Sequence, residues 1–222
     1  MVDSGSPVAP VKLVILPRTR VGLGREGLRR YLETVHGPMV MNEPDVSGKF
    51  CRYVHHYVKD VTEMNGVEFL QDRDAVTIIC AASIADLGLS KANDGYSNRI
   101  GPDEDNFRQI EGSVALLADE FEVAPGVDDA QHKLLIFRNG NCREEAWVRT
   151  MGKIVRDYGL RGATTNNAKV IEGHFPYSQF DEIGLTATSD MGSLIAEIYE
   201  QAREHFGVLD TKLLYVESVR FI

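Results

Sequence analysis

The feature of this chain that most constrains its fold is a pattern that occurs twice, about a hundred residues apart. The run Lys12-Leu-Val-Ile-Leu-Pro17 returns as Lys133-Leu-Leu-Ile-Phe-Arg138. Each copy is followed by an Arg-Glu pair, Arg25-Glu26 and then Arg143-Glu144, which opens a helical pattern. The repeat predicts two copies of one structural unit, each beginning with a strand and then a helix.

The two copies end alike but differ at one place that matters for chemistry. Leu116 to Glu120 returns as Leu213 to Glu217 at an offset of 97, which predicts a repeated closing strand with two equivalent glutamates in structural roles. The first helix runs into His36-Gly37-Pro38, whereas the corresponding place in the second copy holds Ile154 or Val155. Any catalytic chemistry is therefore predicted to lie in the first half.

Hydrophobic period predicts the same order of elements in both halves. Continuous apolar runs are typical of buried strands, and apolar residues at three-and-four spacing are typical of helices. In the first half these patterns predict strands at 11–16, 50–58, 75–84 and 114–123, with helices at 28–35 and 85–92 and Pro38 as a helix stop. In the second half they predict strands at 134–137, 163–171, 182–188 and 212–222, with helices at 144–158 and 192–206.

This order is that of the ferredoxin-like βαββαβ unit, an antiparallel sheet with both helices on one face. Because the other face of each sheet needs a cover, we expect an α+β fold in which the two sheets pack as an α/β barrel within one chain. The expected organisation is a flexible tail at 1–10, a first domain at 11–124, a linker at 125–130 and a degenerate second domain at 131–222. Such a duplication removes the need for a homodimer without forbidding one.

Charge and composition exclude several classes of protein. A net charge of −9 with scattered basic residues argues against nucleic acid as a partner. The sequence has neither a membrane-spanning apolar run nor a signal peptide, so we expect a cytoplasmic protein without membrane contact. The three cysteines, Cys51, Cys80 and Cys142, are read as free thiols without metal spacing. No metal or phosphate-binding motif is present, and we expect neither a metal nor an organic cofactor.

Several motifs of the first half fit together as one pattern. They are the apolar opening strand, the Arg-Glu helix start, His36-Gly37-Pro38 at the helix end, Arg52-Tyr53-Val54 in the next strand and Glu120 in the closing strand. This pattern resembles the EthD-like branch of the dimeric α/β-barrel superfamily, which includes lactone isomerases, polyketide cyclases and dehydratases, decarboxylases and cofactor-free oxygenases. The resemblance implies an apolar pocket between sheet and helices that holds a small ring compound beside one or two acid-base groups.

The chemically richest segment is the second strand of the first half. In a strand Tyr53, His55 and Tyr57 point one way, and Arg52 and His56 point the other way. A Tyr-His-Tyr row offers a proton acceptor between two hydroxyl donors, whereas the opposite row would place an arginine and a histidine beside an anion.

We favour the Tyr-His-Tyr row, with His36, as the site. His36, His55 and Tyr53 are the catalytic candidates, while Tyr57, His56 and Arg52 are candidates for substrate binding. The alternative is structural: His36 orders its helix end, and the strand histidines are partners of carboxylates.

Three further candidates for substrate binding lie in the second half. Asn167 on a predicted strand, and His174 and Tyr177 just after it, could line a ligand cavity, although an ordered loop is the alternative. The acidic segment 102–107 is read as solvated surface or as a lid, and Trp147 is assigned to the core.

Three functions are compatible with these residues. The first is a cofactor-independent lyase or isomerase that uses histidine and tyrosine for elimination, decarboxylation or cyclisation of a small apolar cyclic or aromatic compound. The second is a non-catalytic protein that binds a hydrophobic ligand or assists an oxidative degradation system. The third is a cofactor-free oxygenase.

Overall fold

The computed structural model describes residues 10–139, 145–187, 190–206 and 211–222. Residues 1–9 of the predicted tail, Cys142 and the Arg143-Glu144 pair lie outside the described residues.

The elements follow the predicted order in each half. The first half contains β1 (Val11–Thr19), α1 (Gly24–Tyr31), η1 (Leu32–His36), α2 (Gly37–Met41), α3 (Pro44–Ser47), β2 (Phe50–Val58), β3 (Glu63–Met64), β4 (Val67–Glu68), β5 (Ala75–Ala81), α4 (Ile84–Ala92), η2 (Tyr96–Ile100), α5 (Gly101–Asp103), η3 (Glu104–Asn106) and β6 (Arg108–Ala124). The second half contains η4 (Val127–Asp129), β7 (His132–Arg138), α6 (Glu145–Asp157), β8 (Gly162–Glu172), β9 (Gln179–Gly184), α7 (Met191–Phe206) and β10 (Lys212–Arg220).

Eight of these strands close into one antiparallel barrel in the order β1-β5-β2-β10-β7-β9-β8-β6. The four strands of each half are therefore neighbours, as β6-β1-β5-β2 and β10-β7-β9-β8. Two seams, β2 with β10 and β6 with β8, join the halves. The predicted α+β barrel within one chain is confirmed.

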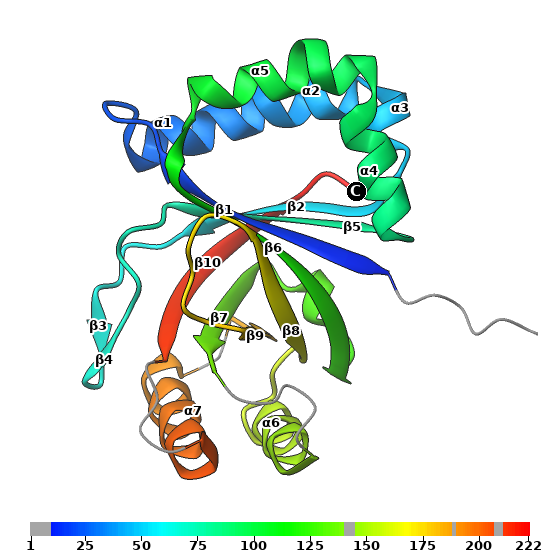
Figure 1. Cartoon of the computed structure of the whole chain (residues 1–222). Helices are drawn as coiled ribbons and strands as arrows, with labels where there is room; N and C mark the ends of the chain where they lie inside the picture. The colour runs from blue at the N-terminus through cyan, green and yellow to red at the C-terminus, as the bar shows by residue number, and fades with distance from the viewer. Residues whose placement is uncertain (1–9, 140–144, 188–189, 207–210) are drawn as a thin grey trace, which may run out of the picture.

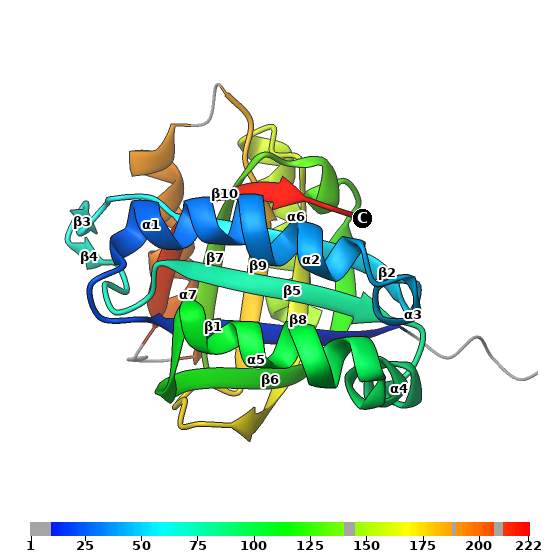
Figure 2. The ribbon, with the colours of Figure 1, turned by 90° about the horizontal axis from the view of Figure 1, so that it is seen from above.

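Helices cover the barrel on two opposite sides (Figure 1). The helices of the first half form the upper layer, in which α1 and α2 run along one side and α5 along the other, with β5 and β1 visible between them (Figure 2). The second half places α6 and α7 on the lower side.

Side chains alternate between the inside of the barrel and these helical layers. Apolar residues fill most of the interior: Val14, Leu16, Val58, Val76, Ile78, Leu116, Leu135, Phe137, Phe180, Leu214 and Val216. A buried charge cluster shares this space, because Lys12 and Lys133 both pair with the fully buried Glu182. Because these charges are matched by opposite charges, their burial is tolerated.

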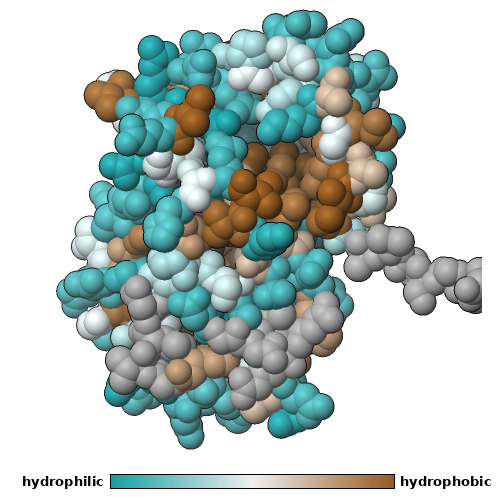
Figure 3. Space-filling view, viewed as in Figure 1, coloured by the Kyte–Doolittle hydropathy of each residue, from teal (hydrophilic) through white to brown (hydrophobic). Residues whose placement is uncertain are grey.

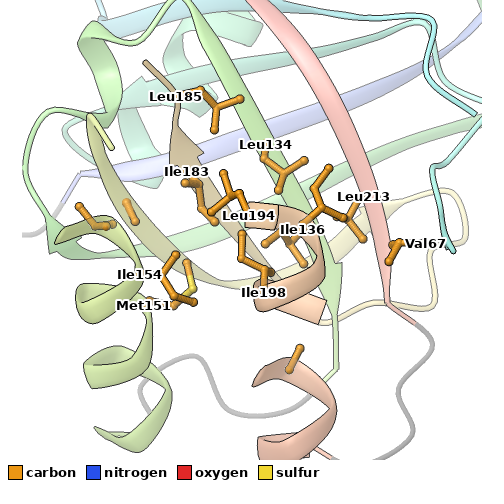
Figure 4. Close-up of a cluster of buried hydrophobic side chains, with 14 of the residues drawn as sticks. Val67, Leu134, Ile136, Met151, Ile154, Ile183, Leu185, Leu194, Ile198 and Leu213 are labelled. Carbon is orange, nitrogen blue, oxygen red and sulfur yellow. The ribbon is translucent and has the colours of Figure 1, made fainter. Parts of the chain in front are cut away.

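The lower helices pack tightly on the sheet of the second half. Trp147 is fully buried there, as the helical period predicted. Figure 4 shows the side chains of both helices meeting those of the strands: Met151, Ile154, Leu194 and Ile198 against Leu134, Ile136, Ile183 and Leu213.

Pro38 does not stop its helix, contrary to the sequence prediction. Residues Leu32–His36 form a π-helical turn in which the Gly37 N–H donates to the Leu32 carbonyl, and α2 continues to Met41. Proline cannot donate to the carbonyl four residues earlier, and its ring crowds that carbonyl. The wider turn accommodates the proline, so the helix continues.

The predicted offset of 97 between the closing strands is wrong by one residue. Lys12 pairs with Ala118, and the repeat-related Lys133 pairs with Val216, which gives an offset of 98. A slip of one residue moves a side chain to the other face of a sheet. Glu120 accordingly pairs with Lys12 and Arg52 inside the barrel, whereas Glu217 pairs with Arg29 in the helical layer.

Two further elements differ from the prediction. β9 begins at Gln179 and ends at Gly184, so it overlaps the expected strand at 182–188 but begins and ends before it. The segment from Tyr96 to Asn106 is helical, although its sequence shows no clear apolar period.

Candidate active site

A cavity of about 290 Å³ lies between the sheet of the first half and its helical layer. The strands contribute its floor, with Leu13, Ile15, Tyr53, His55, Thr77, Ile79, Ala115 and Leu117, and the helices contribute its roof, with Leu32, His36, Val40, Ile100 and Phe107. Figure 3 shows the apolar residues gathered in a hollow beneath the upper helices. The pocket that the family resemblance implied is therefore present at the expected place.

His36 enters the cavity from the roof, and its ring is held by a buried carboxylate. Nδ1 lies 2.9 Å from Oδ2 of Asp103, and the other carboxylate oxygen, Oδ1, accepts hydrogen bonds from Tyr31 (2.5 Å) and Asn106 (3.1 Å). The imidazole packs edge-on against Phe107 at 4.6 Å between ring centroids. No hydrogen bond joins Nε2 to another described residue.

The environment of Asp103 fixes the roles of these atoms. Burial disfavours its charged form, but the hydrogen bonds from Tyr31, His36 and Asn106 outweigh burial and lower the pKa of the carboxyl. An ionised carboxylate only accepts hydrogen bonds, so Nδ1 of His36 must donate. In the neutral ring the lone pair is then on Nε2, the nitrogen that can act as a base.

Tyr53 and His55 form a second polar group on the floor. The Tyr53 hydroxyl lies 3.0 Å from Nε2 of His55, and Nδ1 of His55 lies 2.8 Å from Oγ1 of Thr77. Burial, together with the nearby His36, lowers the pKa of His55 to about 3, so the ring is neutral at pH 7. Burial raises the pKa of Tyr53 well above its ordinary value, so this phenol stays protonated.

A further group of lining residues forms a chain of polar contacts. Tyr96 donates to Glu104 at 2.8 Å, and Arg108 pairs with both Glu104 and Glu172. Burial beside Glu104 raises the pKa of Tyr96, which stays a donor. The lining of the cavity therefore combines the polar groups of His36, Tyr53 and His55 and those of Tyr96, Glu104 and Arg108 with apolar residues.

The two faces of β2 are placed as the strand period predicted. Tyr53 and His55 line the cavity, and Tyr57 points to the same side but lies beyond it, against Arg29. Arg52 and His56 point into the barrel, where Arg52 pairs with Glu120 and His56 contacts Ser218. The hydrogen bonds of both strand histidines go to hydroxyl groups, while His56 also interacts electrostatically with the buried Glu182 carboxylate, as the structural alternative expected.

The candidates of the second half are not brought to the cavity. Asn167 and His174 are exposed on and after β8. Tyr177 packs against Phe137 at the inside of the barrel. None of the three is among the lining residues.

Sequence reasoning missed Asp103, Tyr31 and Thr77, which orient the catalytic candidates. A signal for Asp103 was present, because Ile100-Gly101-Pro102 repeats the form of His36-Gly37-Pro38. Both tripeptides follow a π turn, and the Gly101 N–H donates to the Tyr96 carbonyl as Gly37 donates to Leu32. The acidic segment is thus part of the roof, with Asp103 buried in it.

Two other features are absent from the described residues. These residues contain no group of three or more His, Cys, Asp or Glu placed to hold a metal ion. None of their helices combines the length and apolar character that crossing a membrane requires.

Comparison with known proteins supports the resemblance. Residues 20–110 match the EthD domain. A search of curated proteins found no similar sequence.

Solved structures share the fold over nearly the whole chain. A Lactobacillus acidophilus protein with a provisional monooxygenase assignment aligns with 96% of this chain and 94% of its own, at 11% identity and a TM-score of 0.53. An anthrone oxidase-like protein aligns with 96% of this chain and 93% of its own, at 10% identity and a TM-score of 0.53. A mutant chlorite dismutase from Candidatus Nitrospira defluvii aligns with 96% of this chain and 93% of its own, at 10% identity and a TM-score of 0.52. At such identities the likeness shows the fold alone.

Proposed function

Because residues 20–110 form an EthD domain in a closed α/β barrel, we propose that this chain is an acid-base enzyme without metal or organic cofactor. Its substrate is a small, flat, largely apolar ring compound, and its reaction is an elimination, decarboxylation or cyclisation. The observation that carries the proposal is the His36–Asp103 pair in the roof, opposite Tyr53 and His55 in the floor of one apolar cavity.

His36 is the general base in this proposal. Asp103 holds the imidazole in the tautomer with its lone pair on Nε2, and it stabilises the imidazolium that forms when Nε2 takes a proton. The substrate proton is an acidic C–H beside a carbonyl or a phenolic O–H. The apolar walls exclude water and strengthen the interaction between His36 and Asp103.

Tyr53 is the hydrogen-bond donor to the oxygen on which charge develops. If Thr77 donates to Nδ1 of His55, Nε2 of His55 carries a proton and donates to the Tyr53 oxygen. The phenolic proton of Tyr53 is then available for a substrate carbonyl or phenolate. A neutral His55 with both nitrogens engaged acts through Tyr53 and is not itself the base.

The size of the cavity sets the size of the substrate. An apolar cavity of about 150 Å³ holds one benzene ring. The cavity of about 290 Å³ therefore suits a compound of two fused or linked rings.

A cofactor-free oxygenase is the second candidate, favoured by the names of the structural neighbours, which include a monooxygenase assignment and an anthrone oxidase-like protein. The same deprotonation by His36 would then produce an electron-rich anion that reacts with dioxygen. Assays with and without dioxygen separate this reaction from an elimination or ring closure.

The test compares wild type with His36→Ala and His55→Ala against aromatic ketones, lactones and phenolic acids. Ligand-observed NMR measures binding and mass spectrometry measures product. We expect His36→Ala to lower turnover by about 10²- to 10⁴-fold while the ligand still binds. His205→Ala is the control, because His205 contacts Thr150 in the second half.

Two results would overturn the proposal. One is turnover in His36→Ala equal to that of wild type. The other is binding without product in wild type and in all variants. That result would indicate a non-catalytic protein that binds a hydrophobic ligand.

We also propose that the two halves arose by duplication of one ferredoxin-like unit. The support is the shared strand order, in which the closing strand lies beside the first strand and the second strand lies at the far edge. A cytoplasmic location and a homodimer remain part of the proposal, and light scattering of the purified chain measures its mass against the 24.7 kDa of one copy.

A further inference from the structure

We propose that Phe221, which the second half of the chain supplies, is a positioning residue for the acid-base groups of the cavity. The inference rests on the proposed function, because it gives Phe221 a role in holding the groups that this function uses. Phe221 does not line the cavity, so any effect on a substrate passes through its neighbours.

The backbone around Phe221 continues the seam between the halves up to Tyr53. The Phe221 N–H donates to the Tyr53 carbonyl at 2.8 Å, and the Tyr53 N–H donates to the Ile222 carbonyl at 3.4 Å. The strand residue that carries the donor phenol is therefore held on one side by the second half.

The ring of Phe221 packs behind both groups of the floor. Its centroid lies 5.3 Å from that of Tyr53 at an interplanar angle of 33°, and 5.3 Å from that of His55 at 81°. Edge-to-face and tilted contacts at such distances are favourable for aromatic rings. They restrict the rotamers of the two side chains whose hydrogen bond makes Tyr53 a donor.

The same ring reaches the roof at Gly37, the residue after His36. A Cβ built on Gly37 would lie 2.5 Å from Cζ of Phe221 and 2.7 Å from the Leu32 carbonyl oxygen. Only glycine fits between the π turn and this ring. Where the first half has His36, the helix of the second half has the branched residue Ile154 or Val155.

Phe221 thus contacts the base-bearing turn and the donor-bearing strand at once. The second half positions Phe221 through the pairing of β10 with β2. Ser218 lies opposite His56 and Val219 lies opposite His55, and this register places Phe221 beside the site.

The test needs no substrate. Histidine-labelled protein is titrated by NMR in wild type, Phe221→Ala and Phe221→Leu. The groups that face His55 are Tyr53, Tyr57 and His36. Loss of the ring opens space beside the buried imidazole, and water entering there favours the charged form. We expect the pKa of His55 to rise from about 3 toward 6.5 in Phe221→Ala, and less in Phe221→Leu.

Phe206→Ala is the matched control, because Phe206 contacts Trp147 and Arg138 in the second half and not the site. It should lower stability without changing the pKa of His55. A purely structural Phe221 would behave in the same way as this control, and an unchanged His55 titration in folded Phe221→Leu or Phe221→Ala would overturn the inference. If Phe221→Ala does not fold, Phe221→Leu alone decides.

Once a substrate is known, a second readout separates this inference from the proposed function. Phe221→Leu should lower kcat by about 10- to 100-fold with little change in KM. Absence of turnover in wild type would contradict the proposed function and leave the titration result standing.

Discussion

The two halves of this barrel share a frame but use the space between sheet and helices in opposite ways. The first half leaves a cavity of about 290 Å³ with His36 and Tyr53 in its lining. The second half fills the same space with Trp147, which packs against Phe206, and Arg138 lies beside both rings at 5.1 and 4.7 Å from their centroids.

The strand pairing shows which residues correspond. Ile15 pairs with Thr77, and Thr77 pairs with His55. In the second half Ile136 pairs with Asp181, which pairs with Thr165. Asp181 and Thr165 therefore take the places of Thr77 and His55.

At those places the second half satisfies its polar groups internally. Asp181 accepts two hydrogen bonds from Arg138, at 2.7 and 3.0 Å, and Arg138 donates further to Gln179 and Thr165. One half thus fills this space with packed apolar side chains and paired polar groups, whereas the other leaves it unfilled, with Nε2 of His36 hydrogen-bonded to no described residue.

The largest loss of stability is expected from breaking the buried Arg138–Asp181 ion pair of the second half. Arg138 and Asp181 are both fully buried. Asp181→Leu leaves an unpaired buried guanidinium and should lower the free energy of unfolding by about 4 to 5 kcal/mol, measured in urea. The double variant Arg138→Met with Asp181→Leu should regain most of this loss. A single variant as stable as wild type would contradict the assignment of this pair.

The next largest loss of stability is expected from removing the Trp147 ring, which fills the space between sheet and helices in the second half. Trp147→Ala should lower the free energy of unfolding by about 3 to 4 kcal/mol, because a large cavity forms in a packed core. The indole N–H of Trp147 has no partner among the described residues, so Trp147→Phe should cost under about 1.5 kcal/mol. Added indole should raise the melting temperature of the alanine variant alone, and equal losses in both variants would argue against tight packing here.

Low pH should destabilise the fold because the buried His55 of the first half stays neutral there. Its pKa is about 3 in the folded state and near 6.5 in the unfolded chain, so only the unfolded state gains a proton as the pH falls between these values. His55 alone should therefore lower the free energy of unfolding by up to about 1.4 kcal/mol per pH unit from pH 6.5 toward pH 3, and His56, whose pKa burial also lowers, should add to the same slope. His55→Gln should show a shallower pH dependence, and an unchanged slope would show that His55 is not the group responsible.

The smallest change in stability should come from filling the cavity of the first half. Ala115 lies in its floor, and Ala115→Leu should change the free energy of unfolding by less than about 1 kcal/mol while weakening ligand binding at least about tenfold. Ala118→Leu is the control, since Ala118 points into the packed barrel and the larger side chain should cost about 1 to 3 kcal/mol there. Unweakened binding in Ala115→Leu would place the ligand elsewhere.

The sequence predicted the barrel and the face of β2 that meets the cavity, because both follow from periods of apolar residues. The strand period separates Tyr53 and His55 from Arg52 and His56, and the structure keeps that separation. The helix break assigned to Pro38 failed because a π turn depends on local hydrogen bonds that apolar period does not report.

Partners distant in sequence could not be predicted from one chain. Asp103 is 67 residues from His36, and the helical segment that carries it shows no period. The offset between the closing strands could not be predicted from sequence either. The match of Leu116-Leu117 with Leu213-Leu214 suggests an offset of 97, and only the pairing of these strands with Lys12 and Lys133 shows the true register.

The seam between β2 and β10 also has a consequence for how the chain is made. His56 of β2 contacts Ser218 of β10, which is translated 162 residues later. At synthesis rates of about 5 to 20 residues per second, β2 waits roughly 8 to 32 s for its neighbour. During that time its backbone is an unpaired edge able to pair with another nascent chain. The open edge of β2 therefore exposes the nascent chain to aggregation until β10 emerges.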